Sequence, residues 1–559
     1  MRKRRLHKPM TEPGEHKRRI CRWLVIALAS QLVAGCSAPI LKEDPNIKSL
    51  TTGLNTIDTV QPADLSDSPP ISVEQATKEV TEQITEPNES IPVFELTLEQ
   101  VRAATLANNL DLKVDLINPA IEQRTVDIQR ARFEAAFFGS ASYSASETDT
   151  GVSSTSNNYE VGVDAPLYTG GSIKVGMPFG EFDSDTSDGV ADAAVSVSFI
   201  QSLLQGGGTR INTHWIRIAE YQKHSVDART KQAAIFLLAD ADIAYWRLYM
   251  ACRELDVSRE QYKLAQDHLL HTQKKVASGA AAKIEIVRSE AGLSRRIGNL
   301  INAETRVQNR QLDLQRIMNR QDMPLNANIT IDPNTEPNPL KLDVDQEKLV
   351  EVALSNRMDT IRLELQLAIE ELDLELTRNA ILPELSLRYS YDAQTEAGDI
   401  GHALGAFGDK TSDTHFFGLS ARIPLGNRAA KARLERARLQ QLQSQADYAR
   451  LRQSIRQDVY DAVQELNNSW RNILAAEKDV EAAYLAYKVE QSQFQAGKQD
   501  STQVLRSAGD LAEAQLRRIS ALTGYEIAQI ELARATGTLL GYSRIILEPT
   551  DIQDLTGIR

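Results

Sequence analysis

Two long segments of the chain carry apolar residues at the spacing of an α-helix and contain neither glycine nor proline. One segment lies between Gly208 and Gly279, and the other lies between Gly426 and Gly497. Strong helix formers dominate both segments. Each is predicted to be one long helix, or helices stacked in line, that reaches roughly 105 Å at about 1.5 Å per residue. Such lengths are typical of a coiled-coil tube or a spacer across a compartment.

The two segments belong to one internal repeat. When Gly279 is placed on Gly497, Val276–Gly279 aligns with Phe494–Gly497, and Ile286–Ser289 aligns with Val504–Ser507. Because spacing and sequence agree, the chain is predicted to contain a duplicated unit. Each half should hold a short opening helix, the long helix, and a return helix after the glycine turn. The expected opening helices are residues 98–136 and 346–381, and the expected return helices are residues 281–320 and 501–540.

Between the opening helix and the long helix of each half, the apolar period changes from 3.6 residues to 2. In the second half, residues 384–391 and 416–425 alternate in this way. They predict strands of about 9–10 residues, long enough to cross a bilayer when tilted. The first half shows the same alternation at residues 140–145 and 195–199. An additional hairpin is predicted at about 159–180, and the pattern leaves open whether it joins the other strands.

Two strand pairs from one chain cannot close a barrel, and an open sheet edge is not tolerated in lipid. If the strands enter a membrane, several copies must therefore share one barrel, and three copies of four strands would supply 12. The long helices offer a surface for such an assembly. The alternative is a small water-exposed β-domain carried on a coiled coil.

The N-terminus resembles the signal of a bacterial lipoprotein. Residues 1–22 hold nine Lys and Arg against two Glu, and Trp23–Gly35 is a mostly apolar run too short to span a bilayer. The run ends in Leu32–Cys36, which is similar to a lipobox, where a peptidase cuts before a cysteine that receives lipid. Cys36 is therefore predicted to be lipidated, the alternative being an ordinary buried cysteine. Under the sorting rule that this motif resembles, Ser37 permits transfer to the outer membrane.

The composition excludes several classes of protein. The 559 residues carry a net charge of −13, which becomes −20 if residues 1–35 are removed, so a general nucleic-acid binder is excluded. Three cysteines exclude a disulfide scaffold and a Cys-rich zinc site, and Cys252 would remain as a single free thiol. The mean hydropathy of −0.34 suggests a soluble helical protein. However, barrel strands alternate apolar and polar residues, so their apolar face does not raise the mean hydropathy.

The order of these parts resembles the TolC-like outer-membrane efflux family over about residues 96–541. The segments that carry the resemblance are Leu96–Gln100, Phe199–Gly208, Leu382–Leu387 and Phe417–Gly426, together with the turns around Gly279 and Gly497. The resemblance implies a homotrimer in which four strands per chain form a 12-stranded outer-membrane barrel. It also implies a helical periplasmic tunnel, a periplasmic adaptor and an inner-membrane pump as partners, and no chemistry on the cargo.

The resemblance also assigns roles at the turns of the two helical hairpins. The positions implied to contact the adaptor are Ser278, Gly279, Ala496 and Gly497. Well-known members have acidic residues that narrow the tunnel at the second tip, and the matching positions here are Gln503 and Arg506, so that acidic ring is not reproduced. A gate lined by Glu285, Gln503 and Arg506, linked by Glu285–Arg506 ion pairs, is the resulting hypothesis. The alternative is that these are solvated charges of little energetic weight.

Signals for an enzyme are weak. His268 and His271 lie three residues apart on a helix, but without a third ligand they are expected to be surface histidines and not a metal site. Gly206–Gly208 lacks the Lys-Ser/Thr of a phosphate loop, and a strand-to-helix turn explains it better. We therefore expect no catalytic residues, cofactor, metal or nucleic-acid partner.

The predicted fold is mainly α with a transmembrane β-barrel, in a lipid-anchored outer-membrane channel of a tripartite efflux or type I secretion system. The alternative is a trimeric envelope scaffold or adhesin stalk without a pore. The sequence does not identify the cargo, the pump or the adaptor. The predicted division is a signal peptide (1–35), a lipidated tether (36–95), a first repeat with an extra hairpin (96–320), a linker (321–341), a second repeat (342–541) and a tail (542–559).

Overall fold

The fold is taken from a computed structural model of the chain. It describes residues 92–149, 151–185, 187–327, 329–405, 412–496, 498–499 and 501–543. All of these residues lie in the second of two compact units, Ile91–Arg559. The predictions for Cys36 and Gly497 fall outside the described residues, as do those for the signal peptide and most of the tether. Within the described ranges, no helix is both long and apolar enough to cross a membrane.

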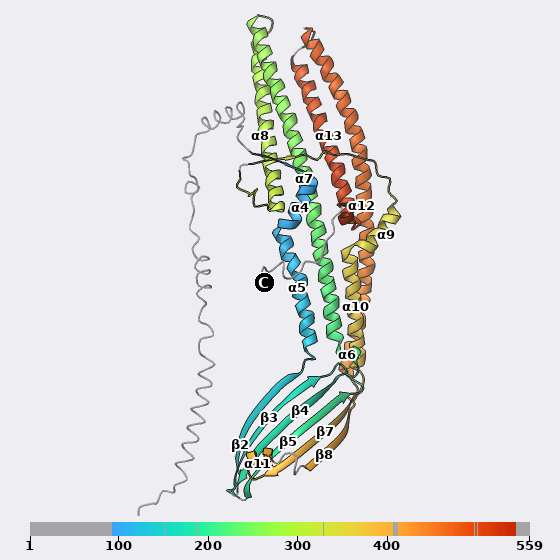
Figure 1. The fold of residues 1–559 in the computed structure, drawn as a ribbon. Coiled ribbons are helices and arrows are strands. Elements are labelled where there is room, and N and C mark those ends of the chain that lie inside the picture. The colour runs from blue at the N-terminus through green and yellow to red at the C-terminus, as the bar shows by residue number, and fades with distance from the viewer. Residues whose placement is uncertain are drawn as a thin grey trace, which may run out of the picture. The chain divides into compact units, whose positions relative to one another are not determined.

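Each half of the second unit is built on one very long helix (Figure 1). The long helices are α7 (His214–Ala277) and α12 (Arg428–Gln495), with 64 and 68 residues. Each is a single helix, of about 96 Å and about 102 Å at 1.5 Å per residue. The return helices are α8 (Ile284–Met318) and α13 (Ser501–Ala535). Both helical hairpins turn at the same end of the unit, where the chain reverses directly after each long helix.

The opening helix of each half is broken in two, so the prediction of continuous helices over 98–136 and 346–381 is wrong. The backbone is extended at Asn109 (ψ 130°) and at Arg357 (ψ 132°), which interrupts the helical hydrogen bonds. The Asn109 side chain then accepts a hydrogen bond from the backbone N–H of Leu112 and starts the next helix. The four helices are α4 (Leu98–Asn108), α5 (Leu110–Ala131), α9 (Gln346–Asn356) and α10 (Met358–Asn379).

Helix α7 carries the main core of the unit. It packs against α4, α5, α8, α10 and α13, so it contacts both halves. Its side chains Leu238, Tyr245 and Leu248 are completely buried. A second cluster joins α9, α12 and α13, where Val350 and Tyr525 pack against α12. Burying a large apolar side chain contributes about 1.5–3 kcal/mol, so these two clusters hold the bundle together.

The strands form one six-stranded antiparallel sheet in the order β2-β3-β4-β5-β7-β8. The expectation of four strands per chain is therefore wrong: the extra hairpin β3–β4 is inserted between β2 and β5. The strands are also longer than predicted, because backbone pairing continues into polar segments such as Ser153–Asn158. Their bounds are β2 (Ala136–Glu147), β3 (Ser153–Pro166), β4 (Gly171–Ser184), β5 (Ser187–Ser202), β7 (Glu384–Ala397) and β8 (Ser412–Arg422).

A small parallel sheet of β1 (Val93–Leu96) and β6 (Thr330–Pro333) was not predicted. It pairs residues that the sequence analysis assigned to the tether and to the inter-repeat linker. The Tyr245 hydroxyl fixes the sheet to α7, because it donates to the Leu96 carbonyl and accepts from the Thr335 backbone N–H. Three short helices complete the described part of the unit: α6 (Thr209–Asn212), α11 (Ile400–Gly405) and α14 (Leu539–Tyr542).

Candidate functional site

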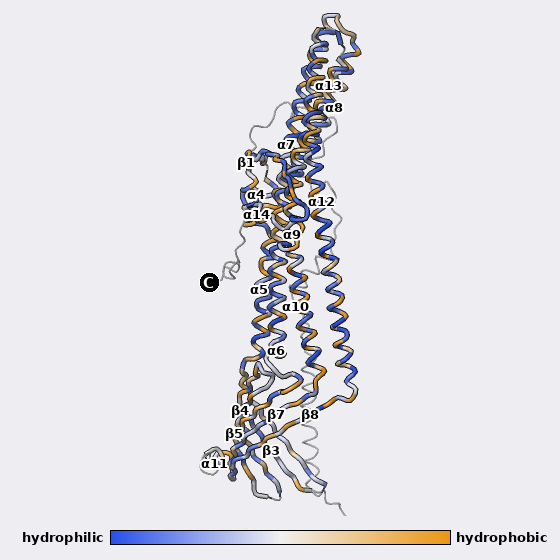
Figure 2. The backbone as a smooth tube through the Cα atoms, turned by 90° about the vertical axis from the view of Figure 1, so that its right-hand side faces the viewer, coloured by the Kyte–Doolittle hydropathy of each residue, from blue (hydrophilic) through white to orange (hydrophobic). Residues whose placement is uncertain are grey.

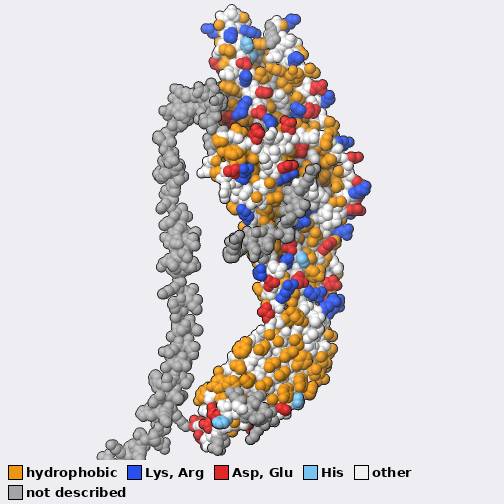
Figure 3. All heavy atoms as spheres, in the orientation of Figure 1, with side chains coloured by type: hydrophobic (Ala, Val, Ile, Leu, Met, Phe, Trp, Pro, Cys, Tyr) orange, Lys and Arg blue, Asp and Glu red, His pale blue; other side chains and the backbone are white. Residues whose placement is uncertain are grey.

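One face of the six-stranded sheet carries a broad band of apolar side chains next to the helices (Figure 3). Residues paired directly across neighbouring strands share a face, and the pairing gives rows of apolar side chains that run from strand to strand. One row is Phe137, Val163, Val175, Val197 and Tyr391, on five successive strands. A polar hairpin would interrupt these rows, but β3 and β4 continue them. The sheet therefore presents a continuous surface suited to lipid acyl chains.

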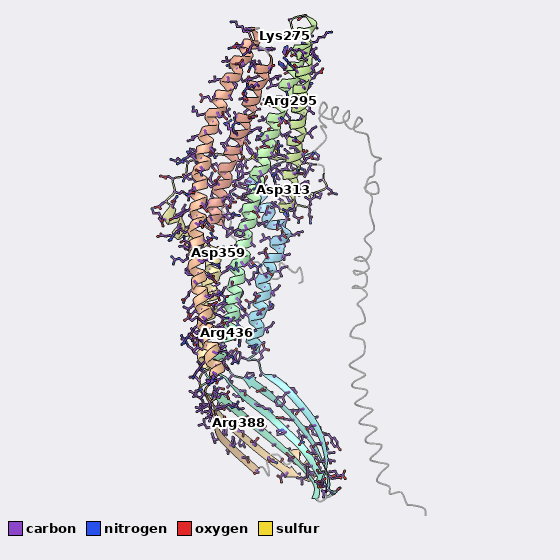
Figure 4. The ribbon with its side chains drawn as sticks, turned by 180° about the vertical axis from the view of Figure 1, so that it is seen from behind. Lys275, Arg295, Asp313, Asp359, Arg388 and Arg436 are labelled. Atoms are coloured by element: carbon purple, nitrogen blue, oxygen red, sulfur yellow. The ribbon has the colours of Figure 1, made fainter. Side chains whose placement is uncertain are left out.

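The opposite face of the sheet is polar. On β2 it carries a series of serines, and on β3 and β4 it carries an ion pair between Glu160 and Lys174, with 2.7 Å between oxygen and nitrogen. The Lys174 ammonium also lies 4.6 Å from the centre of the Phe138 ring. On β7 the same face carries Arg388 (Figure 4). Charged groups are costly against hydrocarbon, so this face is suited to a water-filled lumen.

The two outer strands of the sheet, β2 and β8, each have one edge that pairs with no other strand among the described residues. These edge strands carry highly exposed aromatic side chains: Phe137 and Phe417 have exposed fractions of 77% and 74%. Unpaired backbone N–H and C=O groups at a sheet edge bind another strand readily. Each of these two edges can therefore pair with a further strand through its backbone N–H and C=O groups.

A glycine-rich turn, Gly206–Gly208, joins the sheet to the helices, as the sequence predicted. The backbone N–H of Gly208 donates to the Thr169 carbonyl in the turn between β3 and β4, and the Gly206 N–H donates to the Asn379 side chain at the end of α10. A Cβ atom at Gly170 would clash with the Gly206 carbonyl oxygen. The turn of the extra hairpin is therefore packed tightly into the junction between sheet and bundle.

Two helices carry stripes of apolar side chains that stay exposed. At 100° per residue, each stripe lies within an arc of about 60° on α5 and about 100° on α12. The helices lie on different sides of the bundle, since α5 packs on α7 whereas α12 packs on α9, α10 and α13 (Figures 1 and 2). The stripe on α5 is Leu110, Val114, Ile117, Ile121 and Ile128, and the stripe on α12 is Leu439, Leu442, Leu474, Leu485 and Val489.

The residues implied to contact an adaptor lie at the turns between long and return helices, where Figure 4 labels the nearby Lys275. Ser278 ends α7, Gly279 makes the turn with a φ of 74°, and Ala496 ends α12. Because a φ near 74° favours glycine, the Gly279 turn depends on the residue type. Both turns lie at one end of the bundle, as the repeat predicted.

The proposed gate residues lie on the first turns of the two return helices. Glu285 is in the first turn of α8 and pairs with Arg288 of the same helix at 2.7 Å. Gln503 and Arg506 lie in the first two turns of α13. The structure therefore places all three at the tip end of the bundle. The pairing of Glu285 with Arg288 was not predicted from the sequence.

A pocket of about 550 Å³ between the two hairpins lies near the tip and is lined by His268, Lys275 and Phe494 among others. The expectation of surface histidines holds for His271 but is wrong for His268, which is only 9% exposed. Burial lowers the pKa of His268, and His271 and Lys275 lower it further. Lys275 of the first hairpin lies 3.7 Å from the centre of the Phe494 ring of the second. This cation–π contact joins the two tips.

A deeply buried ion pair joins the first opening helix to α7. Arg102 binds both carboxylate oxygens of Asp242, at 2.8 and 2.7 Å, and Asp242 is completely buried. Burial raises the pKa of Asp242, although the bond to Arg102 opposes this effect. In the second half, Arg357 holds Asp359 and Asp458 beside an open groove of about 630 Å³. Neither cluster was predicted from the sequence, and each of them links helices.

Cys252 on α7 is a free cysteine. Burial raises the pKa of the Cys252 thiol to about 12, so it is protonated and unreactive at neutral pH. Across the described part of the chain, no group of three or more His, Cys, Asp or Glu side chains could hold a metal ion.

The amphipathic sheet and paired long helices can be compared with known proteins. A family described as "Outer membrane efflux protein" matches residues 349–538, which is most of the second repeat. The second repeat is therefore similar to an outer membrane efflux protein. No curated protein sequence gives a match.

Solved structures extend the likeness to both repeats. A membrane protein from Pseudomonas aeruginosa is 19% identical with a TM-score of 0.61, over 79% of this chain and 93% of its own. The Neisseria gonorrhoeae MtrE outer membrane channel is 18% identical with a TM-score of 0.59, over 81% and 94%. The Campylobacter jejuni CmeC outer membrane channel is 16% identical with a TM-score of 0.60, over 79% and 86%. The fold is that of these outer-membrane channels.

Proposed function

We propose that three copies of this chain form an outer-membrane channel that serves a tripartite efflux or type I secretion system. The channel is a passive conduit from the periplasm, or from an inner-membrane pump, to the cell exterior. The observation that carries the proposal is the sheet, which is apolar on one face, polar on the other and, within the described residues, unpaired at both edges. A second support is its position at the end of two helices of about 100 Å, enough to reach across a periplasm.

The apolar stripes support association of copies through the helices. Exposed apolar rows of this length on α5 and α12 are uncommon on a chain that works alone. If α12 of one copy packs against α5 of the next, both stripes are covered and the arrangement closes into a ring. In that arrangement β8 of one copy lies beside β2 of the next copy. The two strands run antiparallel, because β2 leads away from the helices and β8 returns to them.

The N-terminal segment supplies the proposed anchor. Cleavage after residue 35 would leave lipidated Cys36 at the start of a tether that ends near residue 95, at the first repeat. The linker of residues 321–341 then joins the repeats, and residues 542–559 form the tail. Lipid attachment together with an inserted barrel would place the chain in the outer membrane and its helices in the periplasm.

The helical tips supply the proposed contact and gate. Ser278, Gly279, Ala496 and Gly497 would meet the periplasmic adaptor. The constriction of the trimer would be lined by Glu285, Gln503 and Arg506. In the closed gate, Glu285 would pair with Arg506 instead of with Arg288. Single-channel recordings of Arg506→Ala and Glu285→Ala test this gate. Unchanged closed-state conductance in both variants contradicts it.

Planar-bilayer recording of the purified trimer tests the channel itself. We expect discrete conductance steps, and migration on gels that changes on heating, as barrel-containing trimers show. A trimer that never conducts, even with the gate residues replaced, contradicts the channel and favours the scaffold or stalk. Crosslinking from Gly279 and Gly497 in cells should capture an adaptor and so identify the pump.

A further inference from the structure

The extra hairpin of the first repeat is a full part of the six-stranded sheet. Strand β3 pairs with β2 from Ser153 to Asp164 and with β4 from Ser154 to Pro166, so it is paired along nearly its whole length on both sides. We propose that this hairpin lies in the barrel wall and that the trimer therefore closes a barrel of eighteen strands. This inference rests on the proposed function.

The hairpin meets the chemical requirements of a barrel wall on both faces. Tyr159, Val161 and Val163 of β3 point to the apolar face, in the rows that continue through β4. The residue between two of them, Glu160, points to the polar face and pairs there with Lys174. If the hairpin covered the sheet or filled the lumen, its apolar and polar residues would not be expected to alternate in register with those of β2 and β5.

The turn of the hairpin is fixed at the junction between sheet and bundle. The Ser202 N–H donates to the Gly170 carbonyl, and the Thr169 hydroxyl donates to the Gln201 side chain at 2.7 Å. The Tyr168 ring stacks on Phe133, with 4.2 Å between ring centres. These contacts hold the hairpin beside β5 at the end of the sheet where the helices begin, so it cannot swing out of the sheet as a mobile flap.

The additional strands change the width of the outlet. With strands about 4.8 Å apart and tilted by about 40°, twelve strands enclose a backbone diameter of about 24 Å and eighteen enclose about 36 Å. The number of helices around the tunnel is unchanged by the hairpin. The outlet therefore accepts cargo of larger cross-section than a twelve-stranded barrel would, while the helical tunnel that leads to it is unchanged.

Cysteine labelling in the membrane tests whether the hairpin lies in the wall. Val161→Cys and Glu160→Cys place thiols on the two faces of β3, and Tyr391→Cys and Asp392→Cys place thiols on the same two faces of β7. The native Cys252 should stay silent because its pKa is about 12. We expect a water-soluble thiosulfonate to modify the variants at Glu160 and Asp392, and a lipid-phase maleimide to modify those at Val161 and Tyr391.

The outcomes separate this inference from the proposed function. Alternation on β7 with uniform aqueous labelling on β3 overturns the eighteen-stranded barrel and leaves the channel intact. Loss of alternation on both strands overturns the membrane barrel itself. Electron microscopy of the detergent-solubilised trimer gives a second readout without any variant: eighteen strands support the inference, and twelve with a separate hairpin contradict it.

Discussion

Helices α7 and α12 occupy equivalent places in the two repeats, yet their surroundings differ. Helix α7 is covered on several sides by helices of both repeats and contains the completely buried Leu238, Tyr245 and Leu248. Helix α12 is covered on one side, and its exposed stripe includes Leu474 and Leu485. Duplication thus supplied two helices of similar length, and only one of them is completed within the chain. The other keeps an exposed apolar stripe, where a neighbouring copy is proposed to pack.

The largest expected effect concerns the buried ion pair on α7. Arg102→Met leaves the Asp242 carboxylate buried without its partner, and we expect a loss of about 3–5 kcal/mol in the free energy of unfolding. Denaturant unfolding, followed by the helical circular dichroism of the detergent-solubilised chain, measures it. A second change, Asp242→Asn, should restore part of the loss. No recovery in the double variant would mean that Arg102 acts through packing alone.

The stability of the same variant should also depend more strongly on pH than that of the parent. Burial already raises the pKa of Asp242 in the folded chain, and loss of Arg102 removes the effect that lowers it. The folded state then binds a proton more readily than the unfolded state. The stability of Arg102→Met relative to the parent should therefore increase as the pH falls from 7 toward 5. A constant difference across this range would contradict the assignment.

A matched pair of leucines measures the difference between the helices directly. Leu248→Ala on α7 creates a cavity among buried side chains and should cost about 2–5 kcal/mol. Leu474→Ala on α12 removes an exposed side chain and should change the stability of the isolated chain by less than about 0.5 kcal/mol. Denaturant unfolding of the two variants side by side makes the comparison. Equal losses in both would show that α12 is covered within one chain.

The stripe on α12 should matter to the assembly instead. Leu474→Asp and Leu485→Asp each place a charge where the neighbouring copy is proposed to pack. We expect at least a tenfold weaker trimer, equivalent to about 1.4 kcal/mol, with the helical signal unchanged. Light scattering across a dilution series measures the trimer fraction. Asn472→Asp, which adds the same charge at an exposed position of α12 about 60° outside the stripe, is the control.

The smallest effects are expected where the repeats agree. Each long helix is joined to its return helix by exposed ion pairs, Arg306 with Glu254 in the first repeat and Arg517 with Asp479 in the second. Because solvent screens such pairs, Arg306→Ala and Arg517→Ala should each cost about 0.2–1 kcal/mol. Thermal unfolding of both variants in low and high salt measures this. A loss of several kcal/mol in either would show that one pair is part of a buried network.

The sequence predicted the large elements because their signals are long. A long segment of strong helix formers without glycine or proline predicts a helix in any context, and alternation placed both the barrel strands and the extra hairpin. The breaks at Asn109 and Arg357 were missed because neither residue forbids a helix, and only the backbone shows the extended turn. Strands β1 and β6 were missed because they are short and far apart in sequence.

At the tips, the repeat predicted where the two helical hairpins turn, but it did not predict which side chains face one another there. Which side chains face one another depends on how two hairpins pack, and one repeat cannot reveal that. His268 shows the limit, because its ring lies against Phe494, which belongs to the hairpin of the other repeat. The spacing of Gln261, Ala265, His268 and Thr272, which are all buried, was the available sign that His268 lies on an inward stripe.

The inserted hairpin also has a consequence for symmetry. In the proposed trimer, six similar repeats around one axis give a helical tunnel that is close to sixfold symmetric. The first repeat contributes four strands and the second only two, so the barrel above that tunnel can be threefold symmetric at most. The Gly206–Gly208 turn lies where the two symmetries meet, and it occurs in one repeat alone. The six junctions between the helical repeats and the barrel therefore alternate between two geometries around the ring. A substitution in the Gly206–Gly208 turn would change three of these six junctions.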